Sequence, residues 1–271
     1  MNETLPPYVA GRFYPGDPED LLRRVRALLA AARGSGPAPR AIVAPHAGYD
    51  YSGPVAASAY ARVAALRGTV RRVLLIGPAH FVRMDCIGAP AYSAFATPLG
   101  EVALDRETIG QLLRQPWVRE LSAAFRGEHS LEVHLPFLQV TLGEFLLTPL
   151  LAGSAKEEHI ARIIGEFWRD PDTLVVVSTD LSHYLPVGVA RQTDAATCRA
   201  IEALQPDDIG EDQACGDRPL KGLLAAARDR GLRVETLDLR NSGDTAGMHD
   251  AVVGYGAWAL VDDSEAVAPR R

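Results

Sequence analysis

The sequence predicts an α/β fold: a single domain over residues 1–271, with a mostly parallel, buried sheet flanked by helices and a C-terminal antiparallel strand pair. Two observations lead to this prediction. Short aliphatic segments typical of buried strands alternate with longer Ala-, Leu- and Arg-rich segments, an order typical of α/β folds. Near the C-terminus, Leu232–Leu239 and Ala251–Val261 are both strand-like with no helix expected between them, which favours an antiparallel pair.

Helix signals begin early in the chain. Asp17 is a suitable N-cap residue, Pro18 takes the first helical position, and Gly34 ends the run of apolar residues at helical spacing. Strands are expected at Arg40–Ala44, Arg72–Ile76, Phe145–Leu151 and Thr173–Ser178. Further helices are expected at Pro54–Leu66, Arg106–Arg114, Glu157–Trp168, Val187–Ala203 and Pro219–Arg230. The linker-like stretch Gly34–Pro39 lies too early to separate two domains, and the residues after Asp262 are expected to fray.

Composition argues against several classes of protein. The 271 residues include 28 Lys and Arg against 34 Asp and Glu, and the net charge of −6 argues against general nucleic-acid binding. The apolar runs are shorter than the ~18 residues that span a bilayer, and the N-terminus lacks the pattern of a signal peptide. We therefore expect a cytoplasmic protein that binds neither nucleic acid nor a membrane. Three cysteines are too few and too widely spaced for a disulfide framework.

Three of the expected strands are followed closely by a histidine. His46 follows the first strand, His80 the second and His183 the fourth. Ligands of open α/β sheets bind beyond the carboxyl ends of the strands, and histidine is both the commonest metal ligand and the usual acid or base near neutral pH. We therefore expect these side chains at one pocket, with His80 on the strand next to that of His46.

A further cluster, Glu128–Pro136, resembles the helix of zinc proteases. Its two histidines, His129 and His134, are five positions apart instead of four, so they do not share one helix face well. Two interpretations stay open. The segment is either a capped helix start with solvated charges, or it contributes one histidine to a pocket.

Cys215 differs from the other two cysteines in its sequence context. It precedes an expected helix, with Asp217 as the expected cap, and the positive end of a helix dipole favours a thiolate. We therefore expect a reactive or metal-ligating thiol at this position. Cys86 and Cys198 lie in a strand-like run and a predicted helix, and both are expected in the core.

Two loop histidines and this thiolate together make a candidate metal site. His46, His80 and Cys215 would form a three-ligand set with open coordination positions, of the kind that suits Fe(II), Cu or Zn. His183 is then expected as an acid or base beside the metal, with Asp180 orienting it.

Seven segments resemble the Memo family, called AmmeMemoRadiSam system protein B in prokaryotes. They are APHAGYDYSG, LLIGPAHF, Thr97–Gly100, GEHSLEVHLPFLQ, VVSTDLSHY, CGDRPL and VVGYGAWAL, in order from about residue 10 to about residue 260. The family is similar in fold to the class III extradiol ring-cleaving dioxygenases, so the resemblance implies one extradiol-dioxygenase-like domain with a single pocket. It also implies a possible pathway link to a radical SAM protein.

The resemblance assigns roles to individual residues of this chain. It implies a metal at His46, His80 and Cys215, and it puts His183 in the place of the acid or base histidine of the dioxygenases. The further pocket positions that it implies are Phe13, where the family often has Trp, Tyr51, His129 and Asp180. The chain departs from the dioxygenases at Cys215, because they use Glu as the third ligand, and a thiolate favours Cu(I), Zn or a more electron-rich iron.

Four functional hypotheses follow. The first is a metal-dependent redox enzyme that acts on a small or protein-borne substrate with one ion, Fe(II) or Cu before Zn. The second is a metal-free cysteine nucleophile, Cys215, with His183 and Asp180 as base and orienting group. The third is a binding module for a phosphopeptide or another protein, and the fourth is redox handling of copper or iron. The expected ligand is a small molecule or a peptide, and the sequence leaves open whether the protein is an enzyme.

Overall fold

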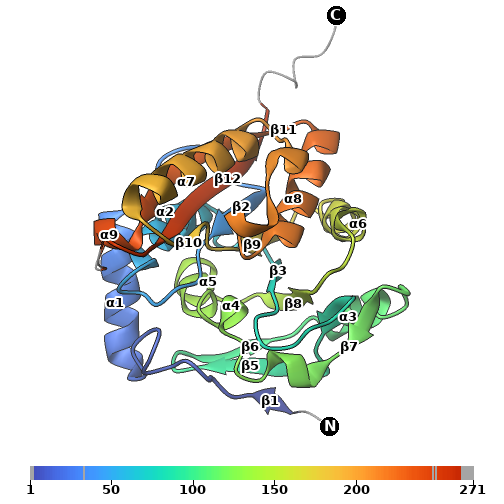
Figure 1. The fold of residues 1–271 in the computed structure, drawn as a ribbon. Helices are drawn as coiled ribbons and strands as arrows, with labels where there is room; N and C mark the ends of the chain where they lie inside the picture. The colour runs from blue at the N-terminus through green and yellow to red at the C-terminus, as the bar shows by residue number, and fades with distance from the viewer. Residues whose placement is uncertain (1–2, 33, 246, 248, 264–271) are drawn as a thin grey trace, which may run out of the picture.

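A nine-stranded sheet lies at the centre of the computed structural model, which describes residues 3–32, 34–245, 247 and 249–263 (Figure 1). Its strands are, in spatial order, β10 (His183–Leu185), β12 (Val252–Asp262), β2 (Ala41–Ala44), β9 (Thr173–Ser178), β3 (Arg72–Pro78), β8 (Leu146–Ala152), β4 (Ile87–Ala89) and β7 (Val118–Glu120), with β11 (Leu232–Asn241) paired along β12. The strands β2, β9, β3 and β8 are parallel, whereas β12 pairs antiparallel with both β2 and β11. The α/β class and the C-terminal antiparallel pair are therefore confirmed, but the sheet is mixed: beyond its parallel centre, β4 pairs antiparallel with β8 and parallel with β7.

Helices cover both faces of the sheet. They are α1 (Pro18–Ala31), α2 (Gly53–Val63), α3 (Arg106–Leu112), α4 (His129–Glu132), α5 (Leu135–Leu142), α6 (Glu157–Phe167), α7 (Val187–Glu202), α8 (Asp217–Arg230) and α9 (Ser242–Thr245). Every residue of β2 and of β9 is buried, although successive side chains point to opposite faces. On one side α1, α2 and α5 pack together, and elsewhere α6 packs against α8, which lies on β9 and β3 (Figure 1).

The long predicted elements agree with the structure to within a few residues. The Asp17 carboxylate accepts hydrogen bonds from the backbone N–H groups of Glu19 and Asp20, so it caps α1 as expected. The cap of α8 differs from the expectation: Gly216 is the N-cap residue and Asp217 is already helical. The predicted helix Pro54–Leu66 is divided into α2 and a 3-10 turn at Ala64–Leu66.

Several short strands, together with α5, have no counterpart in the sequence-based expectations, whereas α3 agrees with the helix expected at Arg106–Arg114. A second, three-stranded sheet consists of β1 (Thr4–Leu5), β5 (Ala94–Thr97) and β6 (Gly100–Ala103), and β4, β7 and α5 were not predicted either. Strands of two to four residues contain too few side chains to show a periodicity. Their existence depends on pairing with partners that are distant in the sequence.

One continuous cluster of buried apolar side chains fills the space between sheet and helices, as in a single-domain α/β fold. Trp168, Trp258 and Tyr60 are the largest of its fully buried members. Cys86 and Cys198 are buried, as expected. Within the described residues, no helix is both long enough and apolar enough to cross a membrane. The expected single domain spans residues 1–271, and the residues after Asp262 are expected to fray. Residues 264–271, which belong to both expectations, lie outside the described residues.

The topology places the candidate loops together. The carboxyl ends of β2, β9 and β3 lie side by side at the same edge of the parallel centre, and His46, Asp180 and His80 follow these three ends. The expectation that His80 follows the strand next to that of His46 is wrong, because β9 lies between β2 and β3.

Candidate metal centre

The imidazole of His46 is fixed by a hydrogen bond to the end of β9. Its Nδ1 lies 2.7 Å from Ser178 Oγ, and the Ser178 hydroxyl donates to the backbone carbonyl of Ser130 at 2.6 Å. Because the hydroxyl proton is used for that carbonyl, Ser178 Oγ accepts a hydrogen bond from the Nδ1–H group of His46. The Nε2 atom of His46 is therefore left with its lone pair, and it lies 3.4 Å from Cys215 Sγ.

His80 is oriented in the same way by a carboxylate. Glu128 Oε1 lies 2.8 Å from His80 Nδ1, and Oε2 accepts the backbone N–H of His80 at 2.6 Å. The same carboxylate caps α4 by accepting the backbone N–H of Ser130 at 2.9 Å. A carboxylate only accepts here, so His80 carries its proton on Nδ1 and leaves Nε2 free as a ligand atom.

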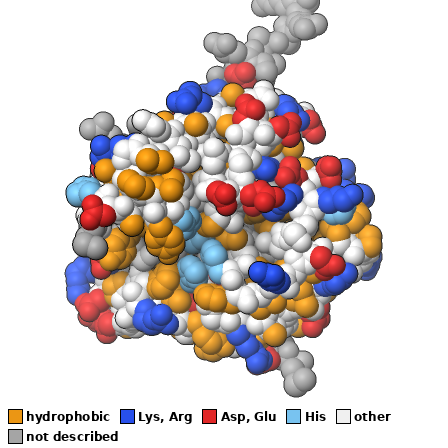
Figure 2. All heavy atoms as spheres, viewed as in Figure 1, with side chains coloured by type: hydrophobic (Ala, Val, Ile, Leu, Met, Phe, Trp, Pro, Cys, Tyr) orange, Lys and Arg blue, Asp and Glu red, His pale blue; other side chains and the backbone are white. Residues whose placement is uncertain are grey.

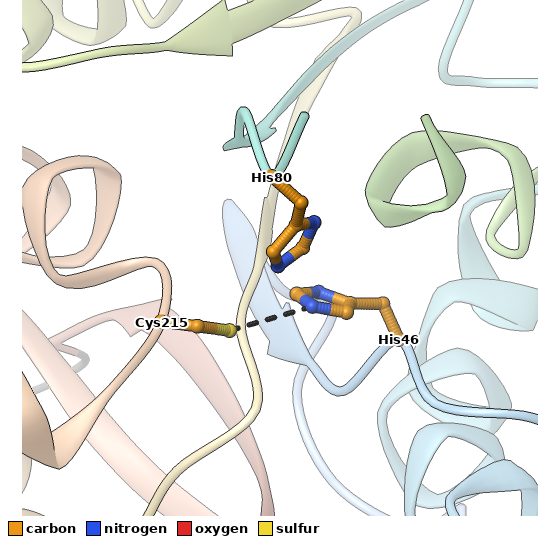
Figure 3. Close-up of side chains that lie close together, drawn as sticks. All are labelled: His46, His80 and Cys215. Carbon is orange, nitrogen blue, oxygen red and sulfur yellow. Dashed lines mark hydrogen bonds between the residues drawn. The ribbon is translucent and has the colours of Figure 1, made fainter. Parts of the chain in front are cut away.

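Cys215 completes the cluster because the chain passes very close to the end of β9. A Cβ atom at Gly216 would lie 2.5 Å from the backbone oxygen of Ser178, so only glycine permits this approach. The backbone N–H of Cys215 donates to the Asp180 carbonyl at 3.2 Å, and the Asp180 N–H points at Cys215 Sγ at 3.3 Å. The ligand atoms of His46, His80 and Cys215 lie within 4.8 Å of one another (Figure 3).

Burial controls the protonation of these groups. Desolvation, followed by the neighbouring histidines, holds the pKa of His46 well below its ordinary value, so this imidazole is neutral. Burial, together with the charge of Asp180, raises the pKa of the Cys215 thiol to about 12. In the protein without a cation, burial therefore favours the neutral thiol and opposes the thiolate that the sequence position before a helix favours. A coordinating metal ion removes the proton from such a thiol.

His183 and Asp180 lie at the site but are not paired as expected. The Nδ1 atom of His183 lies 2.7 Å from the backbone carbonyl of Leu181, whereas Asp180 Oδ1 accepts the backbone N–H of His46 at 2.8 Å. The expectation that Asp180 orients His183 is therefore wrong. Burial raises the pKa of Asp180 to about 7, although its hydrogen bond from His46 opposes this shift, and burial lowers the pKa of His183.

Only one histidine of the Glu128–Pro136 cluster lies at the site. The ring of His129 is stacked on His80 with centroids 4.6 Å apart, and Phe13 lies 4.9 Å from His129. Burial, followed by the charge of His80, lowers the pKa of His129 to about 4. His134 is instead buried in the core, with Nδ1 2.8 Å from the Tyr60 hydroxyl.

The site is open to solvent. Figure 2 shows histidine side chains at the surface near the middle of the view, with hydrophobic side chains beside them. Tyr51, on the loop that follows His46, is 46% exposed. A hollow of about 730 Å³ lies beside Cys215, between residues 78–85, residues 152–154 and the start of α8. Cys215 is one of the residues that line this hollow.

Glu128 and Ser178 are the residues of this site whose roles sequence reasoning missed. The sequence suggests only a solvated charge at Glu128, yet its side chain is 2% exposed and contacts His80. Ser178 is the last residue of a predicted strand. The sequence distinguishes it only as a polar residue at the end of an apolar run. Each of these residues is separated from its histidine by 48 or more positions in the sequence, so the spacing of motifs does not reveal either contact.

Comparisons with known proteins agree on one family. The family model described as "Memo-like protein" matches residues 6–259. A MEMO1 family protein of Methanopyrus kandleri is 35% identical over 276 residues, covering 93% of this chain and 96% of that protein. A MEMO1 family protein of Aquifex aeolicus is 34% identical over 260 residues, covering 92% and 96%.

A solved structure shares the fold at low sequence identity. It is an uncharacterized protein of Escherichia coli K12, with a TM-score of 0.55 and 10% identity, covering 80% of this chain and 98% of that chain. At this identity the likeness concerns the fold alone.

Proposed function

The chain belongs to the Memo-like family, and from this premise and the geometry at the strand ends we propose that it is a metal-dependent redox protein. The ion, Fe(II) or Cu before Zn, is held by His46, His80 and Cys215. The observation that carries the proposal is the hydrogen bonding of the two histidines. Both donate through Nδ1 to a fixed acceptor and offer Nε2 to the site, the arrangement typical of metal-ligating imidazoles.

The donor set fits such an ion. Neutral imidazole nitrogen suits Fe, Cu and Zn, and a thiolate adds the soft character that favours Cu(I), Zn or electron-rich iron. Three protein ligands would leave coordination positions free for a substrate, as in catalytic rather than structural sites. The lowered pKa of His46 also supports the proposal, because only the neutral imidazole binds a metal.

The residues around the ligands support a reaction that moves a proton. A bound ion supplies Lewis acidity and, for Fe or Cu, a redox couple. The Leu181 carbonyl keeps the proton of His183 on Nδ1, so Nε2 is available to take a proton from a substrate. Asp180 holds the His46 loop in place through the backbone N–H of His46. We include in the proposal a fold relationship to the class III extradiol ring-cleaving dioxygenases.

The metal-free alternative has less support. A cysteine nucleophile needs a thiolate, and burial raises the pKa of Cys215 to about 12. It also needs a base held by an orienting group, and Asp180 makes its hydrogen bond to His46 rather than to His183. This hypothesis does not explain why Glu128 orients the imidazole of His80.

The first prediction concerns the metal content of single-site variants. We expect the native chain, loaded anaerobically with Fe(II) or Cu(I), to hold one ion, and His46→Ala, His80→Ala and Cys215→Ala to hold none above background. His183→Ala should keep the ion and lose any turnover, because its imidazole is assigned to proton transfer. Elemental analysis after gel filtration measures the content.

His159→Ala is the matched control, because His159 stacks on Trp117 away from the site. It should keep a native metal content. A native chain without bound metal after loading, or ligand variants that retain it, would contradict the proposed function.

A further inference from the structure

A second hollow lies at the edge of the sheet opposite the candidate metal centre. It has a volume of about 780 Å³ and lies where β3 and β8 begin, whereas His80 follows the other end of β3. Because β3 has seven residues, roughly 20 Å separate its two ends. The walls of this amino-edge hollow include residues 71–72 at the start of β3, residues 143–146 at the start of β8 and residues 101–103 of β6. A ligand bound here lies away from the three candidate metal ligands.

The strand β6 turns an unpaired edge toward this hollow. The backbone N–H of Leu104 donates to a carbonyl just before β5 at 2.9 Å, whereas that of Asp105 donates to a carbonyl of β8 at 2.8 Å, on the other side. Backbone groups alternate along a strand, so those of Glu101 and Ala103 point away from β5, as those of Asp105 do. In the described part of the chain β6 pairs with β5 alone, apart from one bridge at Leu104. Such an edge offers hydrogen bonds to another extended chain.

The hollow opens where β6 and β8 separate. The bridge joins Leu104 to Leu147 with the two strands parallel, and the residues that precede it on each strand line the hollow. Apolar side chains lie between them. Val102 is buried at 4% exposure, whereas Leu146 is 42% exposed and so offers apolar surface beside the free edge of β6. The hollow therefore combines unpaired backbone groups with apolar side chains, the two features that an added strand needs.

Charge selects among the chains that could occupy this hollow. Its lining contains three carboxylates, those of Glu101, Glu144 and Asp172, and two guanidinium groups. One of the guanidinium groups, that of Arg72, already forms an ion pair with Asp170, outside the lining. Glu101 and Glu144 are exposed, and neither forms an ion pair with another described residue. The lining therefore favours a cationic side chain beside β6.

We propose that β6 binds an extended segment of another protein, which adds a strand to the free edge of β6 within the amino-edge hollow. The segment residue opposite Glu101 has its side chain on the same exposed face, where a pair of opposite charges is favourable, so this residue is Lys or Arg. Its two neighbours point to the other face, toward the side of Val102, and are apolar. The partner therefore carries the pattern apolar–cationic–apolar in an extended segment. This interaction goes beyond the proposed function and does not depend on the metal.

Three peptides test the backbone and the charge separately. The first probe is the acetylated and amidated peptide Thr-Val-Lys-Val-Thr, titrated into the ¹⁵N-labelled full chain and followed by NMR. It should cause saturable shifts at the backbone amides of Glu101 and Ala103, equally with and without Zn(II). The same peptide with Glu in place of Lys should bind several-fold more weakly, because like charges then face each other. Methylation of the three central N–H groups should abolish binding, because it removes the backbone donors and keeps every side chain.

Variants of β6 assign the binding to this edge. Glu101→Lys should weaken the Lys peptide several-fold and strengthen the Glu peptide, a reversal that a damaged fold does not produce. Ala103→Pro removes an N–H group that points away from β5, and proline is tolerated at such an edge position, so both peptides should bind more weakly while the fold is kept. Glu120→Lys makes the same charge change on the exposed part of β7 and is the control, with native affinity for both peptides.

Several results would overturn the inference. They are the absence of saturable shifts at Glu101 and Ala103 at millimolar peptide, equal binding of the methylated peptide, or an unchanged order of affinities in Glu101→Lys. Sedimentation of the chain alone tests the other occupant. If the native chain forms a dimer that Ala103→Pro abolishes, a second copy fills the amino-edge hollow, and the assignment to another protein is wrong. A monomeric chain that binds the Lys peptide supports it.

Discussion

At the scale of single residues, the acceptors behind the two histidines matter as much as the ligands themselves. Ser178 and Glu128 decide which ring nitrogen of His46 and His80 carries the proton, and hence which one faces the site. Such outer partners raise ligand basicity and fix the ring orientation. The carboxylate is the stronger of the two because it is charged and also caps α4.

Glu128→Gln should therefore weaken metal binding without removing a ligand. The amide still fills the space, but it is an uncharged acceptor and orients His80 less firmly. We expect metal affinity to fall about 10- to 100-fold, measured by competition with a chelator of known affinity. Glu120→Gln, an exposed carboxylate at the end of β7, is the control. Native affinity in Glu128→Gln would show that the carboxylate only caps the helix.

The candidate ligands were predictable from sequence, whereas their partners were not. His46 and His80 stand in similar strand–Pro–His contexts, and Cys215 precedes a recognisable helix. The link between Asp180 and His46 spans 134 residues and connects a side chain to a backbone N–H, which no local pattern reveals. The raised pKa of Cys215 could not be predicted from the sequence either, because it depends on burial of the thiol in the folded chain.

At the scale of elements, one buried carboxylate holds the N-terminal segment against the body of the protein. Glu132 accepts the backbone N–H groups of Tyr8 and Val9 at 2.8 and 2.9 Å, and the Tyr14 hydroxyl at 2.7 Å. This segment carries Phe13, which contacts His129. The sequence did not predict this anchoring, because the segment is irregular and lacks periodic apolar residues.

Tyr14→Phe removes one of these three hydrogen bonds and leaves the ring in place. A hydrogen bond to a buried charged group contributes about 1.5–3 kcal/mol, so the free energy of unfolding should fall by about that amount in urea titrations. Residues 8–14 should also exchange their amide hydrogens faster. Tyr8→Phe makes the same chemical change on a 39% exposed ring and should have little effect. Equal effects of the two variants would refute the anchoring by Glu132.

At the scale of the whole molecule, an ion pair links α2, in the N-terminal part of the chain, to β11 of the C-terminal strand pair. Arg62 of α2 is 2% exposed, and it donates to Glu235 of β11 at 2.7 Å and to the Pro37 carbonyl at 2.6 Å. These contacts connect the segment before β2 with the antiparallel C-terminal pair. Burial acts to raise the pKa of Glu235, but hydrogen bonds from Arg62 and Arg233 outweigh it, so the pKa lies below its ordinary value.

The sign of the pH dependence follows from that shift. A carboxyl whose pKa is lower in the folded state stabilises the fold above its unfolded pKa, about 4.3 for Glu, and loses this contribution as the pH falls through the folded value. Glu235→Gln leaves the Arg62 guanidinium buried without a full counter-charge. We expect a loss of about 1–3 kcal/mol near neutral pH, below the value for a fully buried pair because Glu235 is 22% exposed.

The difference in unfolding free energy between native chain and Glu235→Gln should therefore narrow as the pH falls from about 7 to below about 4. Urea titrations at several pH values measure it, and Glu101→Gln, an exposed carboxyl of β6, supplies the control for loss of charge alone. Zinc content at neutral pH should be native, because the pair lies away from the three candidate ligands. A constant difference across this pH range would mean that Glu235 acts through packing and not through its charge.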